Sequence, residues 1–240
     1  MKLRQLFPLF LASAIPLMAA LASDTVSTSQ GPLKITPIKH ASVMLEFGGK
    51  VIHVDPWSQG DYTGLPKADV IFITDIHGDH MDPAKIAEIK KDGTVIVAPA
   101  AVAKTVTEAT VINNGESKTI AGIQVEAVPM YNLVRGPSAG KLFHDKGRGN
   151  GYVLTLGGKR IYFSGDTESV PEMKALKNID IAFVTMNLPY TMPPEEAAEG
   201  VKAFKPKIVY PYHYRNSDLN VFTTALKDEK GIEVRLRNWY

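Results

Sequence analysis

The sequence predicts an α/β fold of four layers, an αββα sandwich in which two β-sheets pack face to face between outer helices. From residue 33 onward, short β-rich segments alternate with turn residues and with helical patterns. The same order of elements then occurs a second time, which indicates an internal duplication. Because each half presents a sheet that needs a partner face, we expect the two sheets to pack against each other.

The first half begins with a β-hairpin, since Gly48 and Gly49 separate two β-rich runs. The helix that follows has Pro83 in its first turn and Ile86 and Ile89 on one side. In order, the elements are two hairpin strands, a buried strand, a helix and a further strand, at residues 43–47, 51–54, 70–74, 83–91 and 94–98.

The second half repeats three segments in the same order. Five hairpin residues recur at an offset of 109, where Leu45, Gly48, Gly49, Lys50 and Ile52 match Leu154, Gly157, Gly158, Lys159 and Ile161. Residues 180–185 resemble residues 69–74, and residues 207–211 parallel residues 94–99, with a helix over 193–204 before them. Chance similarity of hairpins is the alternative, but three matched segments make duplication the better interpretation. We expect residues 234–240 to close a last strand.

Length and composition are those of an ordinary globular protein. The chain has 240 residues, of which 45% are hydrophobic and 22% are charged, enough for one sizeable core or two small ones. It has no cysteine, which excludes disulfides, a cysteine nucleophile and a cysteine-based zinc site. Any metal site must therefore use histidine and carboxylate. We expect residues 23–240 to form a single domain.

Residues 1–22 predict a secretory signal peptide. Two basic residues precede an apolar run over residues 6–20, and Ala20-Leu21-Ala22 matches an A-x-A cleavage pattern. A signal anchor is the alternative, but Pro8 and Pro16 interrupt the run, which is shorter than the ~20 apolar residues of a spanning helix. The sequence therefore predicts a periplasmic or secreted protein with no stable membrane span after cleavage.

The net charge of +2 resides in this segment, because it contains Lys2, Arg4 and no acidic residue. Without it, 25 basic residues face 25 acidic ones. A formally neutral mature chain gives no electrostatic support for nucleic-acid binding. We therefore expect a small-molecule substrate; the sequence does not indicate an oligomeric state.

Potential metal ligands are concentrated directly after the strand at residues 70–74. The segment Asp75-Ile76-His77-Gly78-Asp79-His80 contains four of them in six residues. Crowded carboxylates and imidazoles are costly to bury unless a cation holds them, and this set suits zinc or manganese. A solvated polar loop that caps itself is the alternative. The density of ligands favours a metal site.

Three more candidate ligands follow other predicted strands or precede one. Asp166 follows the second hairpin, and His213 follows the last strand of the second half. His144 lies in the connection between the halves. Taken singly, each could be a hydrogen-bonding residue near a turn. One loop cannot fill two coordination spheres, so we expect other strand ends to contribute.

The chain resembles the metallo-β-lactamase fold superfamily, and within it the branch of ascorbate-phosphate lactonase and N-acylphosphatidylethanolamine phospholipase D. The most specific motifs are His77-Gly78-Asp79-His80, Gly165-Asp166-Thr167 and Pro211-Tyr212-His213. The similarity covers essentially the whole mature chain and also implies the αββα sandwich. It implies two divalent metal ions as cofactors.

By position, the resemblance implies that one metal is held by Asp79, His80 and His213, and the other by Asp75, His77 and His144, with Asp166 bridging them. The family signature usually begins with histidine where this chain has Asp75. A carboxylate there would favour manganese or iron more than imidazole does. Alternatively the first site is weak and only one metal is bound.

In some relatives the ligand between the halves directly follows a Val-Pro strand end, which here would select Asn132. A neutral amide oxygen is a poor zinc ligand, so His144 is preferred. His40 precedes the first hairpin and, in relatives, a histidine there supports the site. Asp55 ends a hairpin strand and is expected to hydrogen-bond a ligand histidine.

The connection over residues 130–151 is long, and long connections are often functional lids. A flexible basic surface loop is the alternative for this segment. Its residues, together with tyrosines and an arginine of the second half, are candidate contacts for an anionic or polar substrate at the mouth of the site. The main candidates are Tyr131, Arg148, Tyr190 and Tyr214.

The hypothesis that follows is a metal-dependent hydrolase that uses a metal-activated water on an ester, lactone or phosphodiester substrate. Asp79 would act as the catalytic carboxylate that orients the water and moves its proton. A non-catalytic or degenerate metal-binding protein of the same fold is the alternative, motivated by Asp75. A periplasmic β-lactamase is a third reading.

Overall fold

The computed structural model describes residues 22–240, so the predicted signal peptide lies outside the described residues except for its last one. Its cleavage and the export that it implies stay predictions. Within the described range, no helix is both long enough and apolar enough to cross a membrane.

Among the described residues, the first sheet has seven strands in chain order, with neighbours in the sequence paired side by side. They are β1 (Asp24–Thr28), β2 (Gly31–Lys39), β3 (Ser42–Phe47), β4 (Lys50–Val54), β5 (Ala68–Phe72), β6 (Lys90–Ala98) and β7 (Thr110–Val111). The helices α1 (Pro83–Ile89) and α2 (Ala100–Ala103) belong to this half. The side chain of Asp82 caps α1 by accepting the backbone N–H groups of Ala84 and Lys85.

The second sheet also has seven strands, and its order runs from β14 to β8. They are β8 (Ser117–Ile120), β9 (Ile123–Met130), β10 (Gly149–Leu156), β11 (Lys159–Phe163), β12 (Ile181–Thr185), β13 (Ile208–Tyr212) and β14 (Glu233–Val234). Three helices accompany it, α3 (Pro171–Lys174), α4 (Pro194–Phe204) and α5 (Leu219–Leu226).

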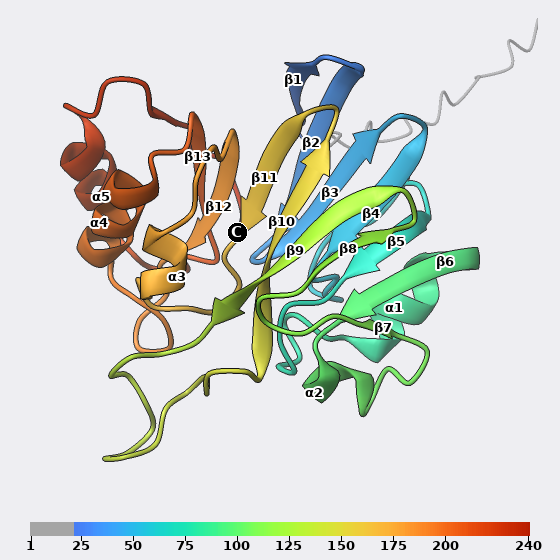
Figure 1. Ribbon diagram of the computed structural model, residues 1–240, viewed down its shortest axis with the longest axis horizontal. Coiled ribbons are helices and arrows are strands. Elements are labelled where there is room, and N and C mark those ends of the chain that lie inside the picture. Colours follow the sequence, from blue (N-terminus) through green and yellow to red (C-terminus); the bar gives the residue numbers. More distant parts are fainter. Residues whose placement is uncertain (1–21) are drawn as a thin grey trace, which may run out of the picture.

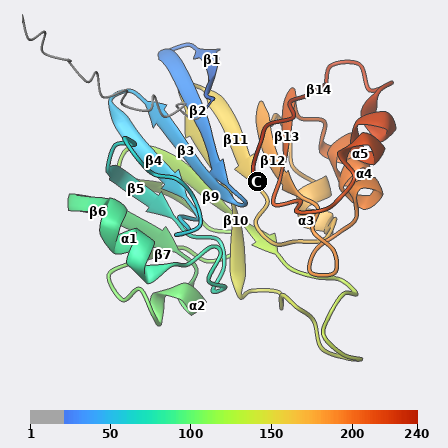
Figure 2. The ribbon, with the colours of Figure 1, turned by 180° about the vertical axis from the view of Figure 1, so that it is seen from behind.

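The two sheets face each other, with helices on both outer sides (Figure 1). The view from behind shows the same layers, with α1 and α2 outside the first sheet and α3, α4 and α5 outside the second (Figure 2). One core cluster contains side chains of both sheets, such as Phe72 and Phe163. Two further clusters lie beneath the helices, one in each half. The predicted αββα sandwich is confirmed.

The predicted duplication is visible in the strand pairing. Each half has an antiparallel hairpin, β3–β4 or β10–β11, followed by two parallel strands. An aspartate at the start of the first parallel strand holds the hairpin in both halves. Asp69 Oδ2 accepts the backbone N–H of Val51 at 2.8 Å, and Asp180 Oδ2 accepts that of Arg160 at 3.0 Å.

The structure differs from the sequence prediction at several element ends. Helix α1 ends at Ile89 because β6 begins at Lys90, so the strand expected at 94–98 is longer and the helix shorter. The prediction that residues 234–240 close a strand is wrong beyond Val234, where β14 ends. The segment instead crosses to the first half, where the Trp239 carbonyl accepts the His40 N–H at 3.1 Å.

Candidate metal centre

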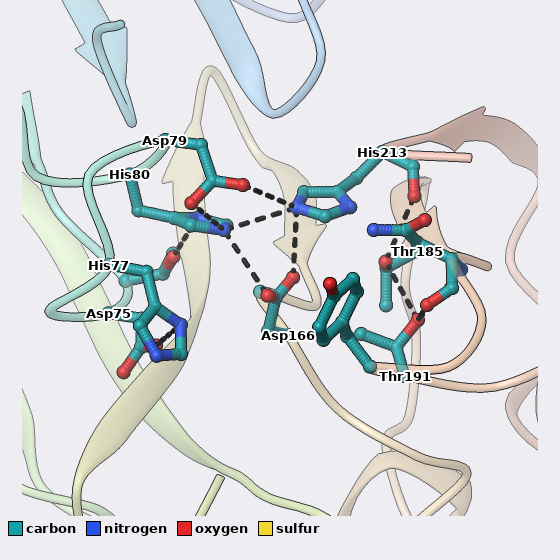
Figure 3. A network of polar contacts seen from close by, with 12 residues as sticks. Asp75, His77, Asp79, His80, Asp166, Thr185, Thr191 and His213 are labelled. Carbon is teal, nitrogen blue, oxygen red and sulfur yellow. Dashed lines mark hydrogen bonds and ion pairs between the residues drawn. The ribbon is translucent and has the colours of Figure 1, made fainter. Parts of the chain in front are cut away.

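Four polar segments meet at one edge of the sandwich, where parallel strands of both sheets end, and Figure 3 shows three of them, which carry residues 75–80, Asp166 and His213. The loop after β5 carries residues 75–80, Asp166 follows β11, and His213 follows β13. His144 lies in the connection between β9 and β10. Since the carboxyl ends of parallel strands lie at the same edge of a sheet, the fold brings these distant segments together.

A first group of converging donors consists of Asp75, His77 and His144. The Asp75 Oδ2 atom lies 2.9 Å from His77 Nδ1 and 3.8 Å from His144 Nε2. Asp75 and His144 are buried, whereas the side chain of His77 is partly exposed. The three donor atoms lie within 4.8 Å of one another, close enough to share one divalent ion.

A second group consists of His80, Asp166 and His213. His80 Nε2 lies 3.2 Å from His213 Nε2 and 3.4 Å from Asp166 Oδ2. Asp79 approaches the same point, because its Oδ2 atom lies 3.5 Å from His213 Nε2 (Figure 3). Two imidazoles and two carboxylates therefore face one another across a few ångströms.

Asp166 lies between the two groups. Its Oδ2 atom is 3.3 Å from His144 Nε2 in the first group and 3.4 Å from His80 Nε2 in the second. Its Oδ1 atom is 3.3 Å from His213 Nε2. One carboxylate therefore faces both groups, with Oδ2 near an imidazole of each group and Oδ1 near the second group.

Three buried side-chain atoms of this cluster have no hydrogen-bond partner among the described residues: His213 Nδ1, the ring nitrogen opposite the one that faces the donors, and His144 Nε2 and Asp166 Oδ1, which both face the donors. A buried polar atom without a partner is costly, and a cation held between the groups would satisfy the two atoms that face the donors. Imidazole with carboxylate, without sulfur, is a donor set for zinc, manganese or iron. The residues present fit a divalent metal.

The electrostatics of the cluster also suit a cation. Burial by itself would lower the pKa of His80, but the carboxylates of Asp166 and Asp55 raise it well above its usual range. Burial would likewise raise the pKa of Asp166, yet the imidazoles of His213 and His80 hold it well below its usual range. Asp166 is therefore ionised at neutral pH, and its negative charge lies within the cluster.

His80 is held by a buried carboxylate. Its Nδ1 atom donates to Asp55 Oδ2 at 2.8 Å, and Asp55 also accepts the N–H and the hydroxyl of Thr74 at 2.7 and 2.6 Å. Because an ionised carboxylate only accepts, the Nδ1 proton is fixed and Nε2 faces the second group. The structure thus places Asp55 against a candidate ligand histidine, as the sequence analysis expected.

Asn132 holds His144 in a similar way. The Asn132 Oδ1 atom accepts the His144 Nδ1–H at 2.6 Å, which leaves Nε2 directed at the first group. The Asn132 amide nitrogen donates to Glu168 at 3.0 Å and to the Tyr190 carbonyl at 2.9 Å. Of the two alternatives for this connection, His144 faces the donors and Asn132 lies behind it.

His40 holds Asp79. Its Nε2 atom donates to Asp79 Oδ2 at 3.0 Å, and its Nδ1 atom accepts the Tyr240 hydroxyl at 2.6 Å. Burial lowers the pKa of His40 to about 4, so the ring is neutral at neutral pH. The Tyr240 oxygen in turn accepts the backbone N–H of Arg215 at 2.8 Å.

Several residues around the cluster have a left-handed backbone, which is uncommon for residues other than glycine. The φ angles of His40, Asp55, His213 and Arg215 are 58°, 46°, 49° and 40°. Such conformations cost free energy and persist where the surrounding structure enforces them. The fold therefore fixes the directions of these side chains.

A cavity of about 310 Å³ opens onto the donors. It is lined by His77, Asp79, Phe143, His144, Asp166, Asn187, Tyr190, His213 and Arg215. The lining contains donors of both groups and also the rings of Phe143 and Tyr190, whose centroids are 5.1 Å apart. Tyr190 therefore lies where the sequence analysis expected a substrate contact.

The other three candidate contacts do not line this cavity, and their contact with a substrate stays a prediction. The Tyr131 hydroxyl donates to Glu172 at 3.1 Å, and the ring of Tyr214 packs beside that of Tyr240. Arg148 turns inward to a buried carboxylate of the first group. Each side chain has a partner within the protein, and none of the three lines the cavity.

Asn187 and Phe143 line the cavity although sequence reasoning did not select them. Asn187 had a usable signal in the repeat, because it follows the strand that is equivalent to β5. Phe143 precedes His144, but nothing in the sequence indicates its direction.

Comparisons with known proteins show the family of the chain. Residues 34–213 match the family model of the beta-lactamase superfamily domain. The chain belongs to the beta-lactamase superfamily. The UPF0173 metal-dependent hydrolase of Thermococcus onnurineus is 34% identical over 197 residues, which cover 76% of this chain and 84% of that protein.

Solved structures extend the comparison. A protein from Parabacteroides distasonis, described as a candidate metal-dependent hydrolase, is 46% identical with a TM-score of 0.85, covering 90% of this chain and 98% of its own. An isothiocyanate hydrolase from Delia radicum gut bacteria, at 18% identity and a TM-score of 0.62, covers 83% of this chain and 95% of its own and shares the fold. The chain is thus a metal-dependent hydrolase of this superfamily.

Proposed function

We propose that this hydrolase uses two divalent ions, zinc or manganese, to cleave an ester, lactone or phosphodiester. The observation that carries the proposal is the position of Asp166 between two donor groups, within 3.4 Å of imidazole nitrogens of both. The first ion would be held by Asp75, His77 and His144, and the second by Asp79, His80 and His213, with Asp166 shared.

Divalent ions in these groups would supply Lewis acidity and a more acidic water. The chain's own residues set the geometry of attack. Asp79 lines the cavity and is held by His40, so it is placed to accept a hydrogen bond from the attacking water and to take its proton.

The cavity also carries features that suit a polar or anionic substrate. No described carboxylate lies within 4.0 Å of the Arg215 guanidinium, so this cation is available at the mouth. The side-chain amide of Asn187, a residue only 2% exposed, has no hydrogen-bond partner among the described residues. We infer that Arg215 and Asn187 contact the polar part of the substrate and that Phe143 and Tyr190 contact its apolar part.

The test uses the chain purified without chelator and then loaded with zinc or manganese. Ester, lactone and phosphodiester substrates are assayed together with nitrocefin, which probes the β-lactamase alternative. Replacing His80 or Asp166 by alanine is expected to abolish metal-dependent turnover. Asp92→Asn, which changes an exposed carboxylate at the far end of β6, serves as the control and should retain full activity.

Retained turnover in both alanine variants would contradict the proposal. Metal binding without turnover of any substrate class would favour the non-catalytic alternative. Hydrolysis of nitrocefin in preference to the other substrates would instead favour a β-lactamase.

A further inference from the structure

Asp75 is held by an arginine from a distant part of the chain. The Arg148 Nε atom donates to Asp75 Oδ1 at 3.1 Å, and its Nη2 atom donates to Oδ2 at 2.9 Å. The Asp75 side chain is fully buried and that of Arg148 is 20% exposed. Two parallel N–H donors on two carboxylate oxygens fix both the position and the rotation of the carboxylate.

The backbone builds this contact into the fold. Arg148 directly precedes β10, and the next residues are docked on the loop that carries Asp75. The Asn150 N–H donates to the Thr74 carbonyl at 2.9 Å. At Gly149, a β-carbon would lie 2.9 Å from the same carbonyl and 2.2 Å from the end of Met130, so only glycine allows this approach.

Three of the other donors also have a buried partner that fixes their direction. Asp55 holds His80, Asn132 holds His144, and His40 holds Asp79. Arg148 holds Asp75 in the same way. It differs from the others in carrying a full positive charge.

Charge explains why a cation is suited to this place. Asp75 adds a negative charge to the first group, in which His77 and His144 are the other donors. The guanidinium balances that charge, so the pair presents an oxygen donor with no net charge. A neutral imidazole would present a nitrogen donor with no net charge. Lysine could supply the charge but not the two parallel donors.

We propose that Asp75 and Arg148 act as one unit in the first group, with Arg148 as a positioning residue that directs Asp75 Oδ2 at the point faced by His77 and His144. The proposal rests on the proposed function, since it assumes that the first group holds a metal. It assigns Arg148 to the metal centre and not to the substrate.

The probe is Co²⁺, which reports its coordination through visible absorption. Parent and variant chains are titrated with Co²⁺ against a chromophoric chelator, and bound metal is counted by mass spectrometry. The variants are Arg148→Lys, Asp75→His, and Asp75→His combined with Arg148→Gln. Lys146→Gln is the matched control, because it removes a positive charge from the same connection without touching Asp75.

We expect the parent to bind two equivalents. Arg148→Lys should weaken the first-group equivalent by about 10–100-fold, the usual effect of losing a residue that holds a ligand. Asp75→His alone should weaken it similarly, because the guanidinium is left unpaired beside the metal. Adding Arg148→Gln should raise the Co²⁺ affinity of the first group about tenfold above that of Asp75→His. Its visible spectrum should show one more nitrogen ligand than that of the parent.

The outcomes separate this proposal from the proposed function. The proposal that Asp75 and Arg148 act as one unit would be overturned if Arg148→Lys bound Co²⁺ as tightly as the parent. It would also be overturned if the double variant bound Co²⁺ no more tightly than Asp75→His. A single equivalent in an active parent would overturn it as well, while a hydrolase with one metal would survive. No Co²⁺ bound by a folded parent would reject both. Thermal melting of each variant identifies any that fail to fold. If a variant at Asp75 fails to fold, the Co²⁺ affinity of Arg148→Lys alone decides the proposal.

Discussion

The loops that follow β5 and β12 occupy equivalent places in the two halves and begin in the same way. After the hairpin, the N–H of Asp55 donates to Phe72 at 2.9 Å, and that of Ser164 donates to Phe183 at 3.0 Å. The side chain of Asp55 then accepts the N–H of Thr74, and the side chain of Ser164 accepts that of Thr185. Both strand ends are therefore held by the same pair of hydrogen bonds, one to a backbone carbonyl and one to a side chain. We call this pair the clasp.

Beyond this clasp the two loops differ in chemistry. The loop after β5 carries the carboxylates and imidazoles of residues 75–80, whereas the loop after β12 is uncharged and contributes Asn187 and Tyr190 to the cavity. The second half supplies its donors from other strand ends, as Asp166 and His213. The two halves thus share the same arrangement of strands, which we call the frame. The site lies between the halves because each of them supplies different side chains.

The largest effect is expected where the clasp itself differs, at Asp55 and Ser164. In Asp55→Asn an amide N–H would face His80 Nδ1 and favour the tautomer that protonates Nε2, the atom directed at the second group. We expect metal affinity to fall by about 10–100-fold. Isothermal titration with Zn²⁺ measures it.

Ser164→Ala is the matched variant in the other half. It removes the acceptor of the Thr185 N–H, which should lower the free energy of unfolding by about 1 kcal/mol and leave metal affinity unchanged. Equal losses of metal affinity in the two variants would show that the clasps are not specialised.

The repeated frame was predictable from sequence because its signals are local. Glycine turns, apolar runs and a proline at a helix start identified the hairpins, β5, β6, β12, α4 and β13. The edge strand β1 was missed, since its sequence Asp-Thr-Val-Ser-Thr is largely polar and none of its residues is buried. Local patterns also could not show that residues 235–240 leave the sheet to reach His40.

The candidate donors were also selected from sequence, because strand ends of one sheet edge meet in space. Whether they bind metal stays a prediction. The partners that hold them were harder to find. Arg148 is 73 residues from Asp75, and Tyr240 is 200 residues from His40. Sequence alone gives neither the contacts that the fold creates between distant segments nor the direction of a side chain, so the ion pair of Arg148 with Asp75 was not predicted.

A smaller effect is expected in the uncharged loop. Asn187→Ala should lower kcat/KM by about tenfold, the effect of losing about one hydrogen bond to the substrate, and leave the metal content unchanged. Leu188→Ala, which shortens an exposed neighbour outside the cavity lining, is the control and should act like the parent. If Asn187→Ala lost metal, the loop after β12 would also help to hold the metal. The two strand-end loops would then not differ in function.

The smallest effects are expected where the halves are alike, at Asp69 and Asp180. Lys91 Nζ lies 2.7 Å from Asp69 Oδ1, and Lys207 Nζ lies 2.8 Å from Asp180 Oδ1. The hydrogen bond from Lys91 holds the pKa of Asp69 below its usual value. At Asp180 burial acts in the opposite direction, but the hydrogen bond from Lys207 still lowers the pKa.

A carboxylate whose pKa is lowered by folding contributes stability above its unfolded pKa of about 3.9 and loses that contribution as the pH falls through the folded value. Asp69→Asn and Asp180→Asn should therefore each lower the free energy of unfolding by about 0.5–1 kcal/mol at pH 7, a modest loss because both ion pairs are partly solvated. Their melting temperatures should approach that of the parent as the pH falls below about 4. Thermal melts from pH 7 to pH 3 measure this, and a loss of metal from either variant would contradict a purely structural role. Equal small losses in both would show that the duplication kept the frame while only the strand-end loops acquired separate chemistry.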